Sequence, residues 1–451
     1  MRITESLLCV ALVGCADRPV GAVYPEQVKV ETKDLPSNPN REVDILFLVD
    51  SSGSMAEEQA SLRANFPKFM DVLQTIEGGM PNVHIGVTTS SLGQRATDGI
   101  GTASIQGCSG AGDDGALTMD PLVSGRYIID EESGASRNRN YTGTLGDAFA
   151  ALADVGGAGC GIEQHLGAVE RALTNPVNAG FVRPAAKLAV IFIADEDDCS
   201  LAHNNLFESG VDGPVLNFRC TKHGIECDGG NPDLDIPGLR TDCRPKLDSP
   251  YLEPVDRYVD FIKDLKPTWR EDVIVAGIVG DTEPFEIVKN QQQQSVLKPS
   301  CEYGGSQTAF PAVRTGDFLA QFNQSVQETI CEGDLSAAMV KIGVLLKRSF
   351  GDPCWEGQVA DLDPSTPGLQ AECTVSDVRR HPDGSEQELA VIPSCSTGRI
   401  PCWRLEEDAT QCHYTTTKLK LVIDRGGVIP PADVHVKASC VTTDPDGGPF
   451  M

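Results

Sequence analysis

An apolar run followed at once by small polar residues constrains this chain more than any other segment. Val43–Val49 holds six apolar residues in seven, which predicts a strand buried on both faces, as in parallel sheets. The strand ends in Asp50, and Ser52, Gly53 and Ser54 follow directly. Ligands bind at the carboxyl ends of strands in open α/β sheets. The run therefore predicts a ligand site on an α/β fold.

The loop after this strand carries the oxygen atoms that a hard divalent cation prefers. Asp50, Ser52 and Ser54 place one carboxylate and two hydroxyls at alternate positions, and Gly53 permits a sharp turn between them. Ser54 and Glu57 also fit a capping box at the start of the next helix. That alternative explains neither Asp50 nor Ser52, so the loop favours a metal site.

The D-x-S-x-S pattern after a buried strand resembles the metal-ion-dependent adhesion site of von Willebrand factor type A (vWA) domains. The resemblance covers residues 42–349 and implies a doubly wound, mostly parallel α/β sheet that binds Mg²⁺, Mn²⁺ or Ca²⁺. Three loops build the family's site. Asp195 ends a second apolar run, residues 188–194, and matches the aspartate of the third loop.

The second loop departs from the family pattern, because it lacks the threonine that normally binds the metal. It runs from Gly159 to Glu163 without a hydroxyl, so either a water fills the position or Glu163 reaches the metal. A disulfide between Cys160 and Cys199 would account for the departure by holding the second and third loops together. The alternative is that each cysteine pairs within its own insertion.

Two further clusters have both a metal-binding and a structural interpretation. Asp195–Asp198 is a run of four acids, which repel one another unless water or a metal neutralises them. One acid is the ligand candidate, and the others alternatively form a solvated loop. Cys220, His223, Cys227 and Cys243 have the spacing of a zinc site. In an exported protein, disulfides account better for these cysteines.

The N-terminus predicts export. Residues 12–15 match the cleavage box of bacterial lipoproteins, and the resemblance implies that residues 1–15 are a signal peptide and that Cys15 is lipidated. Excluding Cys9 and Cys15 leaves 14 of the 16 cysteines, an even number that predicts up to seven disulfides, with Cys301 and Cys331 among the candidates. We expect a lipid-anchored protein of the outer membrane, periplasm or cell surface.

Composition shifts divide the chain into four segments. A proline-rich flexible tether at 16–41 follows the signal peptide, and the vWA domain at 42–349 has insertions at about 92–142 and 199–250. Residues 350–451 predict a small, cysteine-rich β domain. The layout resembles exported vWA proteins of myxobacteria and related deltaproteobacteria.

The net charge and the absence of a catalytic residue set limit the functions that this chain can have. The formal net charge of −28 argues against binding to nucleic acid or anionic lipid. The sequence shows no second convergent set of acid, base and nucleophile, and we expect no enzyme. We expect a carboxylate from a protein or other macromolecular partner to fill the open coordination position of the metal. The alternatives are an envelope scaffold without metal and a hydrolase.

Overall fold

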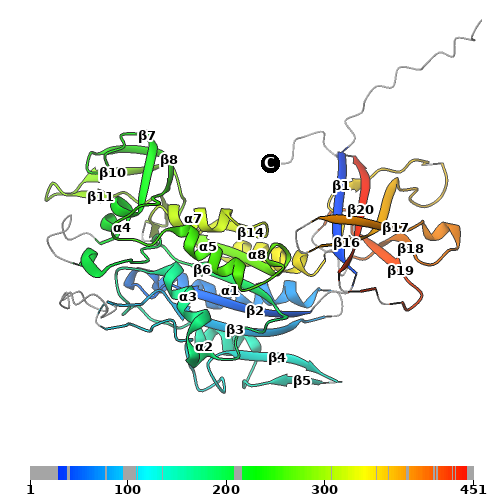
Figure 1. Ribbon diagram of the computed structural model, residues 1–451, viewed down its shortest axis with the longest axis horizontal. Coiled ribbons are helices and arrows are strands. Elements are labelled where there is room, and N and C mark those ends of the chain that lie inside the picture. The colour runs from blue at the N-terminus through cyan, green and yellow to red at the C-terminus, as the bar shows by residue number, and fades with distance from the viewer. Residues whose placement is uncertain are drawn as a thin grey trace, which may run out of the picture.

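The computed structural model describes most of the chain after residue 28, and Figure 1 shows its arrangement. The expected signal peptide and Cys15 lie outside the described residues. The described ranges are 29–37, 41–76, 79–94, 108, 110–134, 136–207, 216–305, 307–351, 353–363, 365–381, 385–409, 412, 415–428, 430–431 and 433–443. Within these ranges, no helix is long and apolar enough to cross a bilayer.

The largest sheet has seven strands in the order β14-β9-β6-β2-β3-β4-β5 (Figure 1). The first five strands in that order pair in parallel, and β4 and β5 form an antiparallel edge. This confirms the expected mixed α/β fold with a mostly parallel sheet. The strand bounds are β2 (Glu42–Val49), β3 (Asn82–Thr89), β4 (Ile128–Ser133), β5 (Ser136–Arg139), β6 (Lys187–Ile193), β9 (Val273–Val279) and β14 (Ser325–Thr329).

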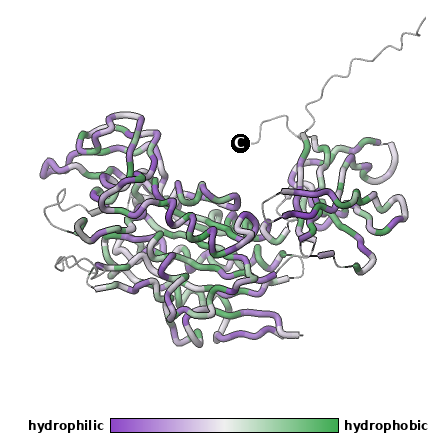
Figure 2. The backbone as a smooth tube through the Cα atoms, in the orientation of Figure 1, coloured by the Kyte–Doolittle hydropathy of each residue, from purple (hydrophilic) through white to green (hydrophobic). Residues whose placement is uncertain are grey.

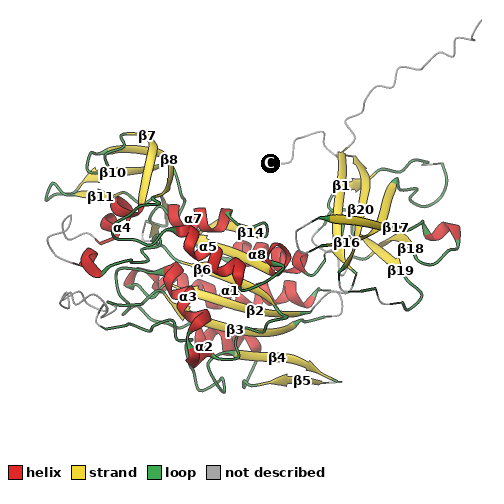
Figure 3. Ribbon diagram, viewed as in Figure 1, coloured by secondary structure: helices red, strands yellow, loops and turns green. Residues whose placement is uncertain are grey.

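Helices cover both faces of this sheet (Figure 3). Phe47 of β2 packs with α1 (Ala56–Gln74), α2 (Leu145–Leu152) and α8 (Ser336–Ser349) on one face. Leu46 and Leu48 pack with α3 (His165–Thr174), α5 (Val255–Asp264) and α7 (Val313–Ala320) on the other. The short helix α6 (Trp269–Asp272) precedes β9. Burial on both faces explains why β2 and β6 are almost wholly apolar (Figure 2).

The order of the parallel strands places a switch point between β2 and β6. Numbered along the chain, the five parallel strands lie in the order 2-1-3-4-5, so the direction of winding reverses between the first and the third. The last residues of these strands, Val49 and Ile193, are directly paired. Ligands of doubly wound sheets bind in the crevice at this point. Asp50 and Asp195, which follow these two strands, therefore lie near each other at this edge of the sheet.

A second, smaller sheet is formed by loops near this edge. It has the strand order β11-β10-β8-β7 and packs against α4 (Leu216–Gly224) around its own apolar cluster. Its strands are β7 (Ile225–Gly230), β8 (Gly238–Pro245), β10 (Phe285–Lys289) and β11 (Ser295–Leu297), and a hairpin of β12 (Cys301–Tyr303) and β13 (Gln307–Ala309) follows. The segment expected as an insertion thus supplies a helix and two paired strands.

The C-terminal part of the chain forms a separate β structure. Its main sheet has the order β1-β20-β16-β17, with β15 beside β20, and β18 pairs with β19. Trp355 is fully buried in the apolar cluster of this part. The strands are β1 (Lys29–Pro36), β15 (Gln358–Val359), β16 (Cys373–Arg380), β17 (Glu386–Val391), β18 (Cys402–Glu407), β19 (Leu419–Asp424) and β20 (Val434–Thr443).

Strand β1 corrects the expected tether. Residues 29–36, inside the segment 16–41 that we expected to be flexible, pair antiparallel with β20 from Lys29↔Thr442 to Pro36↔His435. The segment has little apolar content because it forms a sheet edge, and Val30 is 56% exposed. Its partner lies about four hundred residues away, so local composition could not reveal the pairing.

Seven disulfides connect the described cysteines. The number agrees with the count expected from sequence, and Cys301 pairs with Cys331. Cys220 and Cys227 are bonded to Cys199 and Cys243. These thiols therefore form disulfides, as favoured over the zinc alternative.

Candidate metal centre

Asp50 is the centre of a hydrogen-bonded group of oxygens at the end of β2. It is fully buried, and its Oδ1 accepts hydrogen bonds from the Ser52 backbone N (2.9 Å) and from Ser90 Oγ (2.8 Å). Ser52 Oγ donates to Asp50 Oδ2 over 3.3 Å, and the hydroxyls of Ser52 and Ser54 lie 2.9 Å apart. The three residues of the D-x-S-x-S pattern therefore lie together, with their oxygens turned toward one another.

Asp195 follows β6 and adds a second carboxylate to this group. Its side chain is hydrogen-bonded to Ser54, while its buried Oδ1 has no hydrogen-bond partner. Burial, together with the charges of Asp50 and Glu196, raises the pKa of Asp195 to about 8, although the bond to Ser54 opposes the rise. A buried carboxylate in this position lacks a nearby positive charge that would stabilise its ionised form.

The donor set fits a hard divalent cation. Two carboxylates and two hydroxyls are the ligand types of Mg²⁺, Mn²⁺ and Ca²⁺, and the unpaired Oδ1 of Asp195 is an available ligand atom. Among the described residues, no three His, Cys, Asp or Glu side chains come close enough to hold a metal by themselves. Serine hydroxyls must therefore complete any site at this edge.

The second loop contacts the first through its backbone. The Gly159 N–H donates to the carbonyl oxygen of Ser51 over 2.9 Å, and a Cβ at Gly159 would lie only 2.9 Å from the same oxygen. Gln59 Nε2 also donates to the carbonyl oxygens of Asp50 and Gly156, at 2.9 Å each. A side chain at Gly159 does not fit against Ser51, which is a physical reason for glycine at this position of the second loop.

The predicted disulfide between Cys160 and Cys199 is wrong. Cys160 is bonded to Cys108, and Cys199 is bonded to Cys220, so each pairs with a cysteine of an insertion. The second and third loops are instead joined by a backbone hydrogen bond from Cys199 N to the oxygen of Glu163 (2.8 Å). Because this bond already sets their spacing, the disulfide is not needed there, and it does not replace the threonine.

Ser90 is a residue of this site that the sequence interpretation missed. It follows β3, is 1% exposed, and donates the hydrogen bond to Asp50 Oδ1 already described. The signal was a run of four hydroxyl residues, 88–91, at the end of a buried strand. Since the pairing of that strand with β2 was not known from sequence, the run could not be connected to Asp50.

Glu163, the residue of the second loop that we expected to reach the metal if no water does, is buried. Its side chain is 2% exposed and hydrogen-bonded to Glu196, and its Oε1 has no hydrogen-bond partner. Burial raises its pKa well above the usual value, and the charges of Glu196 and Asp50 raise it further. The charge of Asp50 therefore acts on Glu163, but the hydrogen-bond partner of Glu163 is Glu196, the residue after Asp195.

The last two acids of the run have structural roles, so the expected solvated loop is wrong for them. Asp197 accepts hydrogen bonds from the backbone N–H groups of Arg314 (2.9 Å) and Thr315 (3.0 Å) at the start of α7. Asp198 forms an ion pair with the Arg314 guanidinium over 2.9 Å, and both side chains are at most 1% exposed. The basic partner lies over a hundred residues away, which hid it from a local interpretation.

Comparisons with known proteins give no close relative. No family model matches the chain, and no curated protein matches it. Solved structures that align include a von Willebrand factor type A protein from Catenulispora acidiphila, with 10% identity, a TM-score of 0.27, and coverage of 93% of this chain and 65% of that one. The pilus adhesin of Streptococcus pneumoniae aligns with 13% identity and a TM-score of 0.28, over 92% and 58% of the two chains.

A third alignment is with proximal thread matrix protein 1 of the mussel byssus. It has 9% identity and a TM-score of 0.26, over 70% of this chain and 48% of that one. The chain thus spans about half to two thirds of the length of these three proteins. Likenesses this low carry no argument about function, and kinship with myxobacterial proteins stays a prediction.

Proposed function

We propose that this chain is a vWA-like protein of the cell envelope that binds a macromolecular partner through a divalent cation. The observation that carries the proposal is the convergence of Asp50, Ser52, Ser54 and Asp195 at the switch point of the sheet. The unpaired, buried Oδ1 of Asp195 supports it further, because a cation there would satisfy an oxygen that the protein leaves without a partner.

The protein's residues would hold the cation and leave one side of it open. Ser52 and Ser54 would bind through their hydroxyls, and Asp50 and Asp195 would bind directly or through water. Ser90 and the Ser52 N–H keep the Asp50 carboxylate in one orientation. A bound Mg²⁺, Mn²⁺ or Ca²⁺ would supply a positive charge, and a carboxylate of the partner would bind to it as the last ligand.

The charge of the protein makes such a centre important. A net charge of −28 repels an acidic partner at long range, although salt screens that repulsion beyond about 8 Å at physiological ionic strength. The local attraction must then come from the cation. We therefore expect the complex to depend on the metal and to be weakened little by moderate salt.

The disulfides support an exported location. Seven disulfides among the described residues suit an oxidising compartment rather than a bacterial cytosol. Lipidation of Cys15 and attachment to an outer membrane or cell surface are part of the proposal.

A metal-free envelope scaffold is the second candidate. It is favoured by one observation, that the second loop presents backbone and glycine where the vWA pattern has a threonine. In that case the hydrogen bonds around Asp50 only hold the loops together. The two functions differ in whether removing the metal releases the partner.

The test is capture of the partner from an envelope extract on the immobilised full chain. With Mg²⁺ present, the wild type should retain a partner that EDTA releases, and the Asp50→Ala variant should retain none. Asp71→Ala is the matched control, because Asp71 is an exposed acid on α1. Capture that is unchanged by both EDTA and Asp50→Ala would contradict metal-dependent binding and favour the scaffold.

A further inference from the structure

A cavity of about 460 Å³ lies between the C-terminal β structure and the part of the chain built around the large sheet, which Figure 1 shows side by side. The C-terminal β structure lines it with the end of β1, with β19 and with the loop that follows β19. The other part lines it with the residue before β2 and with the segments just after α1 and α8. Pockets that bind small molecules are often found at such junctions and have volumes of about 300–1,000 Å³.

This cavity is far from the candidate metal centre. Arg41, which lines it, directly precedes β2, whereas Asp50 directly follows β2, so the two sites lie at opposite edges of the large sheet. A strand of eight residues spans roughly 26 Å. None of the four proposed cation ligands is among the described residues that line the cavity. A ligand bound here would therefore act separately from the cation.

Both parts line the cavity with apolar side chains. Ile76 and Phe350 belong to the apolar core on one face of the large sheet. Leu421 and Val436 belong to the apolar cluster of the C-terminal β structure. All four are buried, although they border a space that the protein does not fill. Hydrocarbon placed against such a wall is removed from water, which favours its binding.

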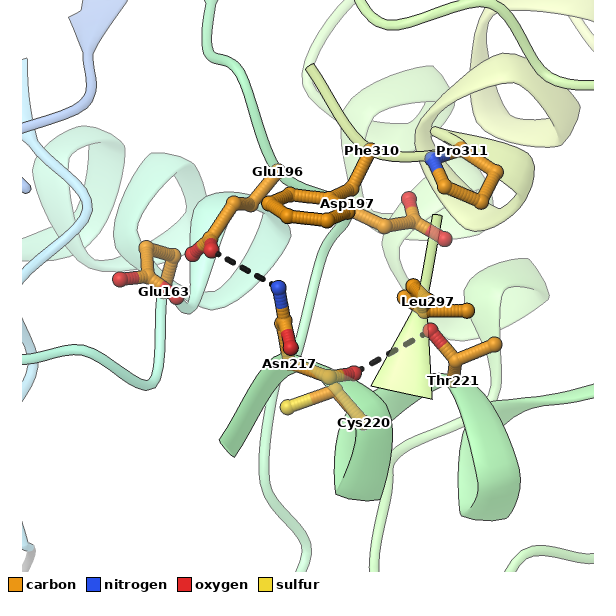
Figure 4. A pocket seen from close by; sticks show the side chains of 9 residues that line it. All are labelled: Glu163, Glu196, Asp197, Asn217, Cys220, Thr221, Leu297, Phe310 and Pro311. Atoms are coloured by element: carbon orange, nitrogen blue, oxygen red, sulfur yellow. Dashed lines mark hydrogen bonds between the residues drawn. The ribbon is translucent and has the colours of Figure 1, made fainter. Parts of the chain in front are cut away.

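The charged side chains of the described lining are all basic. They are Arg41, Lys420 and Arg425, and the described lining contains no carboxylate. The whole chain has the opposite balance, with 65 acids against 37 lysines and arginines. The small cavity beside the candidate metal centre also has the opposite balance, since its described lining carries three carboxylates and no basic side chain (Figure 4). The larger cavity therefore favours an anion.

Hydrogen bonds within the protein hold two of these basic side chains in place. Arg425 forms an ion pair with Asp377 over 2.5 Å and donates to Ser37 Oγ over 3.2 Å. Arg41 donates to the carbonyl oxygen of Gly79 over 2.8 Å. A guanidinium carries five N–H donors in a fixed fork, so an arginine held in this way binds a further oxygen with little loss of side-chain freedom.

We propose that this cavity binds an aliphatic carboxylate, a fatty acid of about ten carbons. The carboxylate contacts the basic side chains, and the hydrocarbon chain lies along the apolar wall. A water takes about 30 Å³ of the liquid and a methylene group is of similar size, so the cavity has room for roughly ten carbons and a carboxylate. The ligand contacts both parts of the chain and so holds the C-terminal β structure against the part around the large sheet.

The test is calorimetric titration of the full chain with decanoate, with decan-1-ol as the uncharged analogue and acetate as the anion without a chain. The wild type should bind one decanoate and no acetate at the same concentrations. It should bind decan-1-ol at least about tenfold more weakly than decanoate, because the alcohol makes no hydrogen bond as a charged group. Asp50→Ala and EDTA should leave decanoate binding unchanged, so failure of the cation site and failure of this cavity are separate results.

Val428 allows a charge to be added at the cavity without removing a buried contact. It lines the cavity and is 69% exposed. Val428→Glu should weaken decanoate binding by about tenfold, because it places a like charge near the bound carboxylate. Val428→Gln is the matched control, since it has the same shape without the charge and should bind decanoate as the wild type does. The two variants should bind decan-1-ol equally.

Three results would overturn this site. The first is a wild type that shows no saturable binding of decanoate. The second is a wild type that binds decan-1-ol as tightly as decanoate, which would show that the basic side chains do not contact the ligand. The third is a Val428→Glu variant that binds decanoate as tightly as Val428→Gln, which would place the bound carboxylate elsewhere.

Discussion

At the scale of single residues, the candidate metal centre combines one tight loop with side chains that other strands and loops supply. Asp50, Ser52 and Ser54 lie within five positions, so their convergence follows from one tight loop. Ser90 and Glu163 reach the same region from other strands and loops. Their contributions depend on strand order and loop packing, which no local pattern contains.

Gly159 gives a prediction at this scale. We expect Gly159→Ala to destabilise the protein by about 1–3 kcal/mol, because the new Cβ would overlap the side chain and carbonyl oxygen of Ser51. The variant should also bind metal less tightly, since the overlap displaces the first loop. Urea unfolding and metal titration measure the two effects.

Gly146→Ala is the matched control for this prediction. Gly146 lies in α2, and a Cβ there would meet its nearest neighbour at an ordinary 3.7 Å. The control should be neutral or slightly stabilising. If Gly159→Ala were as stable as this control, the two loops would not be in the contact described.

At the scale of elements, the two buried strands β2 and β6 were predictable, and the disulfide partners of Cys160 and Cys199 were not. The apolar runs of β2 and β6 fixed two buried strands, because only a strand covered on both faces tolerates so few polar residues. Disulfide partners depend on how the insertions fold back, and Cys160 pairs with Cys108 rather than Cys199. The positions of Asp197 and of the buried Asp198 depend likewise on the distant start of α7.

The ion pair at the start of α7 gives a prediction at this scale. Arg314→Ala should lower the free energy of unfolding by about 3–5 kcal/mol, because it leaves Asp198 buried without its positive partner. Arg244→Ala is the control, since Arg244 pairs with Asp228 at the surface, where water screens the charges, and its loss should be much smaller. Equal losses in urea unfolding at pH 7 would contradict the structural role of Asp198.

At the scale of the whole molecule, one strand joins the two ends of the described chain. β1 lies before the large sheet in sequence and pairs with β20 near the C-terminus. Arg380 of β16 contacts Asp34 of β1 and donates to Glu271 of α6 over 2.6 Å, so the C-terminal part also contacts the large sheet's helices. A tether was predicted because composition reports local propensity alone.

Asp34 gives a pH prediction at this scale. Burial raises its pKa, but the hydrogen bond from His435 and the charge of Arg380 outweigh burial, and the pKa lies below its ordinary value. A lowered pKa stabilises the fold above the unfolded value of about 4, and this stability is lost as pH falls through the folded pKa.

The measurement compares wild type with Asp34→Asn by urea unfolding at pH 6 and pH 3. The wild type should be the more stable at pH 6, and the difference should shrink at pH 3, where the carboxylate takes up a proton. Asp71→Asn, which changes an exposed acid of α1, controls for loss of charge. A difference that is the same at both pH values would show that Asp34 does not couple β1 to β16 and β20 through its charge.

Calorimetric titration of the full chain with Mg²⁺ tests the central claim most directly, because it asks whether the oxygens around Asp50 hold a cation at all. We predict one bound Mg²⁺ for the wild type and for Asp71→Ala, and none for Asp50→Ala. An Asp50→Ala variant that binds Mg²⁺ with the wild-type affinity would contradict the account and place the metal elsewhere.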